Sequence, residues 1–274
     1  MDVSDVLADL LAEQAALDEV VAGLTDEQAA LPTPSPRWTI ADQLAHLTYF
    51  DRNAALAVRD PDAFPATVGA LIDAAVRGDE AADEFTLGAW RSLPATELLA
   101  AWREGRAELA EAAAGLADDD RIAWYGPSMG AKSFLTARLM ECWAHGQDIV
   151  DALQAAGVSA ERPATDRLRH IAQLGAITRK WSYVNRKLEV PEGEVVVELT
   201  APSGETWTYG DGGPDADRIA GPAEDFCLVV TQRRHLDDTA LVVDGEAAHD
   251  WMARAQAFAG PPTDGPAPRP AEEA

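Results

Sequence analysis

The sequence predicts a mainly helical N-terminal domain followed by a smaller α+β domain. Up to about residue 190, apolar residues recur at the three- and four-residue spacing of buried helix faces, which favours a bundle of four long helices. After Pro191 the chain turns to short β-branched runs separated by turns, as is typical of strands. We therefore predict a bundle over residues 1–160, a connecting helix over 161–190, an α+β domain over 191–260 and a disordered tail over 261–274.

The first two helices of the bundle are predicted from periodicity and capping residues. Apolar residues at helical spacing indicate a helix over residues 3–22. After a proline-rich turn, Thr39 is a candidate N-cap, and Asp42 follows three residues later as a capping box requires. This second helix is expected to run to about Val58, with His46 beside its apolar residues.

In the rest of the N-terminal domain the helical pattern is interrupted more often. Prolines and a glycine interrupt residues 60–91, which we interpret as a helical excursion between bundle helices. Residues 92–94 are expected to start the next long helix, and 119–132 to form a loop with a short extended piece at 122–125. Ser133 is the expected cap of the last bundle helix, which ends near Gly157.

The C-terminal part alternates short strands and helices. Residues 165–187 resemble one more periodic helix and lie before the change at Pro191. Beyond it, the predicted strands cover residues 194–200, 205–209, 218–221 and 239–243, and the predicted helices cover 222–235 and 245–258.

Composition limits the class of partner. The chain has 274 residues and a formal net charge of −25, which argues against binding to nucleic acid or to an anionic membrane surface. Cys142 and Cys227 are far apart in apolar runs, so we expect buried free thiols in a reducing compartment. There is no apolar signal segment at the start and no run long enough to span a bilayer. We expect a cytoplasmic monomer or homodimer that acts on a small molecule.

A cluster of polar side chains on the last bundle helix is the main candidate site. Glu141 and His145 are four residues apart and therefore lie on one helix face, and Arg138 and Asp148 fall on the same stripe. The neighbouring positions look like core, where polar groups need partners, and a divalent metal would supply one. With His46 as a third ligand, the set would match a catalytic site that keeps one position open. Asp148 is an alternative ligand or an acceptor for His145, and Arg138 would attract an anionic substrate.

A second motif, residues 126–133, nearly matches a nucleotide-binding P-loop. It follows an extended piece and precedes a helix, but Ala131 stands where the pattern requires glycine before the lysine. We expect instead that this loop lies over the mouth of the bundle, where Tyr125 and Lys132 would contact the cofactor or substrate.

Three segments carry a resemblance to a known family. They are residues 38–47 (WTIADQLAHL), residues 137–148 (ARLMECWAHGQD) and residues 225–234 (DFCLVVTQRR). Through them the chain resembles, over roughly residues 3–260, the DinB-like, mycothiol-dependent maleylpyruvate isomerase family, and within it an actinobacterial metal-binding subgroup. The resemblance implies a DinB-like four-helix bundle with a divalent metal, typically zinc, held by two histidines and one glutamate. Those positions fall on His46, Glu141 and His145. It also implies a C-terminal domain similar to sterol carrier protein.

The resemblance further implies a mycothiol-like thiol cofactor, and an isomerase or S-transferase acting on a small, anionic electrophile. A metal-bound thiol is deprotonated and can attack an electrophilic carbon. An arginine of the C-terminal domain, Arg233 or Arg234, would hold a substrate carboxylate in a bidentate contact. The excursion at residues 60–91 departs from the isomerase pattern, so the sequence leaves the substrate and the choice of thiol open.

Two other functions remain open from the sequence. The chain could be a non-catalytic protein that binds a metal or small ligand, or a hydrolase that uses metal-activated water. Thiol dependence would separate the isomerase or transferase from the hydrolase. An exchangeable position on the metal would separate both enzymes from a structural site. Imidazole and carboxylate ligands also accept nickel, iron and manganese.

Overall fold

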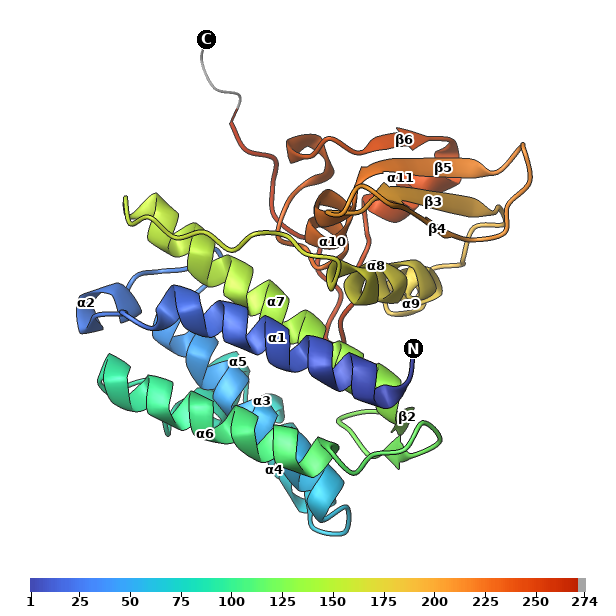
Figure 1. Ribbon diagram of the computed structural model, residues 1–274. Coiled ribbons are helices and arrows are strands. Elements are labelled where there is room, and N and C mark those ends of the chain that lie inside the picture. The colour runs from blue at the N-terminus through green and yellow to red at the C-terminus, as the bar shows by residue number, and fades with distance from the viewer. Residues whose placement is uncertain (271–274) are drawn as a thin grey trace. The chain divides into compact units, whose positions relative to one another are not determined.

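Four long helices make up most of the first structural unit. The computed structural model describes residues 1–270. It divides into a unit from Met1 to Arg162 and a second unit that begins at Pro163. The long helices are α1 (Val3–Val21), α3 (Ile40–Arg59), α6 (Ala95–Ala113) and α7 (Ala131–Ala155). In the first unit α3 packs along α6 and α7, and α1 packs along α7, which gives the predicted four-helix bundle (Figure 1).

The starts of these helices follow from capping residues. The Asp2 side chain accepts a hydrogen bond from the backbone of Asp5 at the start of α1, and the reciprocal bond completes a capping box. Thr39 and Asp42 form the predicted capping box of α3, with Asp42 Oδ2 2.8 Å from the Thr39 backbone nitrogen. Such a cap stabilises a helix by about 1 kcal/mol. It also fixes where α3 begins, and with it the position of His46 on the second turn.

The excursion between α3 and α6 is helical, as expected. It consists of α4 (Phe64–Val76) and α5 (Asp79–Leu87). Gly78 separates the two helices with a φ of 111°, a conformation that favours glycine. A short helix, α2 (Asp26–Ala29), was not predicted; its capping box between Thr25 and Gln28 is the sequence feature that marks it.

The start of α7 differs from the prediction. The helix begins at Ala131, after Gly130, so Ser133 is not its cap. The reason is a small antiparallel pair of strands, β1 (Arg121–Ile122) and β2 (Met129–Gly130), which leads straight into the helix. The backbone nitrogen of Ala131 donates to Asp120 O at 3.0 Å. Trp124 and Tyr125, expected to be extended, lie in the loop between these strands.

The second unit is a mixed sheet with helices packed on it, which confirms the predicted class of a helical domain plus a smaller α+β domain. The strands are β3 (Val195–Thr200), β4 (Thr206–Tyr209), β5 (Asp217–Pro222) and β6 (Val242–Asp244), in the order β4-β3-β5-β6. Only β3 and β5 pair in parallel. The helices are α8 (Leu168–Ile177), α9 (Arg179–Val184), α10 (Ala223–Val230) and α11 (Glu246–Met252), with a 3₁₀ turn at Leu236–Asp238. Of these, α8, α10 and α11 contact the sheet (Figure 1).

Three predicted helices of this unit are shorter than expected. The single helix expected over 165–187 is broken at Thr178, whose φ of −88° and ψ of 6° lie outside the α-helical region. The helix expected to reach residue 235 ends at Val230, because Gln232 adopts a left-handed conformation with a φ of 60°. The last helix ends at Met252 rather than near residue 258.

The end of the chain contains no regular structure among the residues described. Residues 261–270 form neither helix nor strand, although Thr263 O accepts a hydrogen bond from Gln232 at 2.8 Å. The last four residues of the predicted disordered tail lie outside the described part. Within residues 1–270, no helix is long and apolar enough to cross a membrane.

Candidate metal centre

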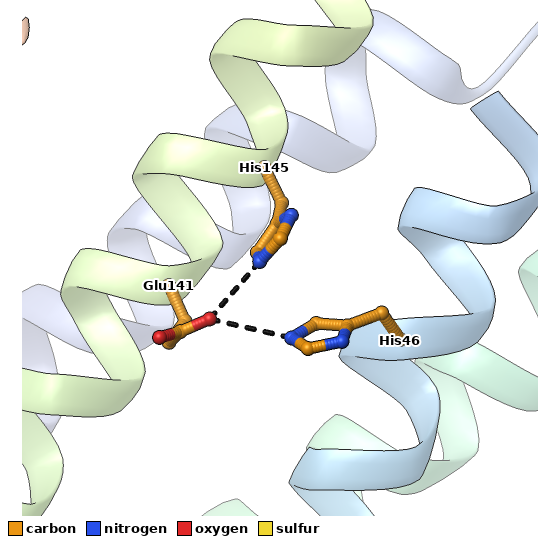
Figure 2. Close-up of side chains that lie close together, drawn as sticks. All are labelled: His46, Glu141 and His145. Atoms are coloured by element: carbon orange, nitrogen blue, oxygen red, sulfur yellow. Dashed lines mark hydrogen bonds and ion pairs between the residues drawn. The ribbon is translucent and has the colours of Figure 1, made fainter. Parts of the chain in front are cut away.

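Three potential metal ligands converge between α3 and α7. His46 lies on α3, and Glu141 and His145 lie one turn apart on α7 (Figure 2). Glu141 Oε2 is 3.3 Å from Nε2 of His46 and 3.0 Å from Nε2 of His145. All three potential ligand atoms lie within 4.8 Å of one another. The structure therefore brings together the three residues that the sequence singled out.

The spacing of these atoms fits a divalent metal. A zinc ion binds imidazole nitrogen and carboxylate oxygen at about 2.0–2.2 Å, so tetrahedral ligands are roughly 3.3–3.6 Å apart. The His46–Glu141 separation of 3.3 Å matches that spacing. The His145–Glu141 separation of 3.0 Å is shorter, so a bound ion would move these two side chains slightly apart. Two imidazoles and a carboxylate also form a donor set that zinc and other first-row metals accept.

The cluster is partly open to solvent. The exposed fractions of the side chains are 15% for His46, 10% for His145 and 25% for Glu141. A structural zinc site is closed by four protein ligands, whereas a catalytic one has three and keeps a position for water or substrate. Three ligands with an accessible carboxylate match the second kind of site.

Burial and mutual contacts leave the ligands in the form that binds a metal. Burial, followed by the neighbouring His145, lowers the pKa of His46 from 6.5 to about 3, so this imidazole is neutral. Burial would raise the pKa of Glu141, but hydrogen bonds with His145 and His46 outweigh it and hold that pKa well below 4.5. Metal ligands must be deprotonated, and these two groups meet that condition at neutral pH.

The contact that orients His145 comes from Gln43, which the sequence analysis did not identify. His145 Nδ1 lies 2.5 Å from Oε1 of Gln43, a side chain that is fully buried. Asp148, the expected acceptor or alternative ligand, is 3.9 Å from His145 Nδ1 and instead accepts a hydrogen bond from Ser35 Oγ at 3.1 Å. Gln43 could have been suspected because it lies three residues before His46, on the same face of α3.

Aromatic rings form the wall of the cluster. The ring of Trp38 lies 5.1 Å from that of His46 and 5.9 Å from that of His145. Phe50 packs 4.5 Å from His46, and Tyr125 packs 5.4 Å from Phe50. Tyr125, a predicted cofactor contact, is thus one ring removed from a ligand. Such walls exclude water and lower the local dielectric around a bound ion.

Arg138 and Lys132 have partners of their own. The guanidinium of Arg138 donates to Asp51 Oδ1 from Nε at 3.1 Å and from Nη2 at 2.9 Å, in a buried ion pair. An anionic substrate would therefore have to compete with Asp51 for the guanidinium of Arg138. Lys132 pairs with Asp118 at 3.0 Å on the surface. It precedes Glu141 by nine residues on α7, or ~13 Å of helix.

Arg233 and Arg234 belong to the second unit, in the turn after α10. Arg233 Nη1 donates to Thr231 O at 2.7 Å, and Arg234 Nη1 donates to Arg233 O at 2.7 Å. Their proposed contact with a substrate stays a prediction. The P-loop-like segment forms part of the antiparallel β1–β2 pair, so it lacks the parallel sheet that a nucleotide site of that type requires.

Comparisons with known proteins identify the family of this chain. Residues 10–150 match the family model described as "Mycothiol maleylpyruvate isomerase N-terminal domain". The chain is also 45% identical over 265 residues to "Uncharacterized protein Rv0036c" and "Uncharacterized protein MT0041", from two strains of Mycobacterium tuberculosis. These alignments cover 96% of this chain and 99% of each relative.

Solved structures show the same fold. One similar structure is described as the mycothiol-dependent maleylpyruvate isomerase, with a TM-score of 0.55, 18% identity, and coverage of 85% of this chain and 90% of that one. A variant of the same enzyme gives a TM-score of 0.55 at 17% identity, covering 86% of this chain and 91% of its own. At this level of identity the likeness concerns the fold.

Proposed function

We propose, from the premise that this chain belongs to the mycothiol maleylpyruvate isomerase N-terminal domain family, that it is a metal-dependent enzyme using a low-molecular-weight thiol. Its substrate would be a small electrophile, and its reaction an isomerisation or an S-transfer. The observation that carries the proposal is the convergence of His46, Glu141 and His145 with an accessible carboxylate. This arrangement fits a metal and leaves room for a fourth ligand.

Each residue of the cluster would have a distinct role. His46, Glu141 and His145 would hold a divalent metal, most readily zinc, and Gln43 would orient His145 through Nδ1. When bound, the metal would supply a thiol in its deprotonated, nucleophilic form. Trp38 and Phe50 would shield the site from bulk water, which favours the attack of a thiolate over that of water.

The protein's own thiols do not suit the role of nucleophile. Cys142 and Cys227 are both buried, with exposed fractions of 2% and 0%. Burial raises the pKa of both thiols, so neither forms a thiolate readily. A thiol reaction at this site therefore needs a thiol from outside the chain, as the names of the solved structures suggest for their own enzyme.

The charge of the expected substrate is a further part of the proposal. Within the first unit, Arg138 is held by Asp51, and Arg37, the residue before Trp38, pairs with Asp79 and Asp83. Arg233 and Arg234, in the second unit, stay the candidates that the sequence suggests for holding a substrate carboxylate. The net charge of −25 makes a small molecule a more suitable partner than nucleic acid.

A cobalt-substituted chain gives the direct test of thiol use. Mycothiol would be added to the Co²⁺-loaded protein and the absorption spectrum recorded. We expect a thiolate-to-cobalt charge-transfer band, which His46→Ala abolishes and His249→Ala, an exposed histidine outside the cluster, retains. A spectrum that mycothiol leaves unchanged would contradict thiol ligation and favour metal-activated water or simple metal binding.

Isomerase and S-transferase are separated by the fate of the thiol. An isomerase returns mycothiol unchanged after each turnover. A transferase consumes one thiol for each electrophile and forms a thioether. Mass spectrometry of the thiol pool after reaction with maleylpyruvate, and with a halogenated electrophile, distinguishes the two.

A further inference from the structure

The loop before α3 is tied to the metal cluster by a chain of hydrogen bonds. The Thr33 backbone nitrogen donates to Trp38 O at 2.9 Å, and Pro32 and Thr39 form an isolated bridge. Arg37 closes the loop with a φ of 71°, in the left-handed region. The loop thus holds Thr33 and Trp38 in a fixed relation directly before the helix that carries Gln43.

From this loop the hydrogen bonds run to His145 through two side chains. Thr33 Oγ1 donates to Trp38 O at 2.9 Å. Gln43 Nε2 donates to Thr33 Oγ1 at 2.9 Å, and Gln43 Oε1 lies 2.5 Å from His145 Nδ1. The chain therefore starts at a backbone carbonyl and ends at an imidazole nitrogen on α7.

The direction of the chain is set by its starting point. A backbone carbonyl only accepts, so the single hydroxyl proton of Thr33 is committed to Trp38 O. The Thr33 oxygen then accepts from the amide nitrogen of Gln43, which turns the Gln43 carbonyl oxygen toward His145. That oxygen also only accepts, so Nδ1 of His145 carries the proton. Nε2, 3.0 Å from Glu141 Oε2, is then the nitrogen that would give up its proton when a metal binds beside Glu141.

We propose that Thr33 and Gln43 are positioning residues that set the proton of His145 on Nδ1 and so prepare Nε2 as a metal ligand. The inference rests on the metal site proposed above and adds the origin of its ligand geometry. A glutamine amide is symmetric in shape and could otherwise present its NH₂ group to His145. Thr33 opposes that flip. In the flipped amide, Gln43 Oε1 would face Thr33 Oγ1, so either the Thr33 hydroxyl would have to leave Trp38 O or two acceptor oxygens would face each other.

The same loop also supplies the indole of Trp38, which stacks on His145 at 5.9 Å with an interplanar angle of 25°. Ring stacking and the Gln43 contact restrain the imidazole in two directions. A purely structural role for Thr33 would affect loop stability alone. A positioning role also affects zinc affinity and the His145 proton.

The test compares Thr33→Val with Thr33→Ser and Thr48→Val. Valine keeps the shape of threonine but removes the hydroxyl, and serine retains the hydroxyl. Thr48 is a buried threonine on α3 whose hydroxyl donates to Leu44 O of its own helix, so Thr48→Val controls for a lost hydroxyl. The probe is Zn²⁺ alone, with its dissociation constant measured by chelator competition. In parallel, ¹⁵N-labelled histidine NMR detects the proton on His145 Nδ1.

We expect Thr33→Val to weaken Zn²⁺ binding roughly 10- to 100-fold, the usual effect of losing an outer contact of a metal ligand. The His145 Nδ1 proton should be lost or exchange faster in this variant. Thr33→Ser and Thr48→Val should match the wild type in both measurements. Gln43→Leu should reproduce the effect of Thr33→Val.

Two different failures are distinguishable. If the wild type binds Zn²⁺ and Thr33→Val binds it equally well with an unchanged Nδ1 proton, the positioning role is wrong and the metal site stands. If no chain binds Zn²⁺, the proposed function is wrong. The NMR measurement on the metal-free chain then still decides whether the hydrogen-bond chain fixes the His145 proton.

Discussion

Arg138 and Asp51 form a buried ion pair that joins α7 to α3, three residues from the ligand Glu141. Their side chains are 3% and 2% exposed, and two nitrogens of Arg138 reach the same carboxylate oxygen. The other oxygen of Asp51 accepts from Gln14 Nε2 at 3.2 Å. The pair thus fixes the helix that presents two of the three ligands.

Removing one member of this pair should destabilise the fold strongly. Arg138→Met leaves the buried Asp51 carboxylate without its cation, which typically costs about 3–5 kcal/mol. Burial raises the pKa of Asp51 even though Arg138 opposes the shift, so the pair does not fully offset its own desolvation. The double variant Asp51→Leu, Arg138→Met should therefore recover most of the lost stability. Urea unfolding of the two single variants and the double variant measures this cycle.

The same cycle decides between two roles of Arg138. If the double variant is stable and binds zinc but loses affinity for an anionic substrate, then Arg138 also serves the substrate, as the sequence suggested. If it binds the substrate normally, Arg138 acts only in packing. A double variant as unstable as Arg138→Met would contradict the account of the pair given above.

The two cysteines should be inert in the folded protein. Burial raises the pKa of both Cys142 and Cys227, so little thiolate forms near neutral pH. Iodoacetamide should label neither residue in the native chain within the time that labels a free cysteine completely. Both should react once the protein is unfolded in urea. Rapid labelling of either cysteine in the native chain would show that a protein thiol competes with an external one.

Asp18 should give the bundle a stability that depends on acid pH. Arg103 holds its carboxylate at 2.7 and 3.0 Å, and Arg106 pairs with the same group. Burial opposes ionisation, but these two arginines outweigh it and lower the pKa of Asp18 below 3.8. Because the folded pKa is depressed, the stabilisation is present above pH 3.8 and is lost as pH falls through the folded value.

Asp18→Asn should therefore lower the free energy of unfolding at pH 7 by on the order of 1 kcal/mol, since the group is partly exposed. The difference from the wild type should shrink as the pH falls below the ordinary Asp pKa of 3.8 and through the lower folded value. Urea titrations across this range provide the measurement. A difference that stays constant with pH would mean that the substitution acts through packing and not through the charge.

Local signals in the sequence were sufficient for much of the fold. The Thr39 and Asp42 capping box was predicted because its two residues are three apart and bond to each other's backbone. Glu141 and His145 share a face for a similar local reason. The start of α7 was placed wrongly at Ser133, because a serine near a helix start says nothing of the β1–β2 pairing that moves the start to Ala131.

The parts of the site that were not predicted depend on partners distant in sequence. Gln43 meets His145 across 102 residues, and Arg138 meets Asp51 across 87. The sequence of one helix does not show which polar residue of the other helix its side chains will contact. Asp148 was expected as the acceptor because a carboxylate three residues from His145 is a local candidate, whereas in the structure it accepts from Ser35. Gln43 was not considered.

The metal content of the purified chain tests the proposed centre most directly. Elemental mass spectrometry would be applied to the wild type, His46→Ala, Glu141→Ala and the control His249→Ala, after reconstitution with zinc and removal of excess metal. We predict about one zinc ion per chain in the wild type and the control, and almost none in the two ligand variants, with circular dichroism unchanged. A wild type that retains no zinc, or ligand variants that retain as much as the wild type, would contradict the assignment of His46, Glu141 and His145 as a metal site.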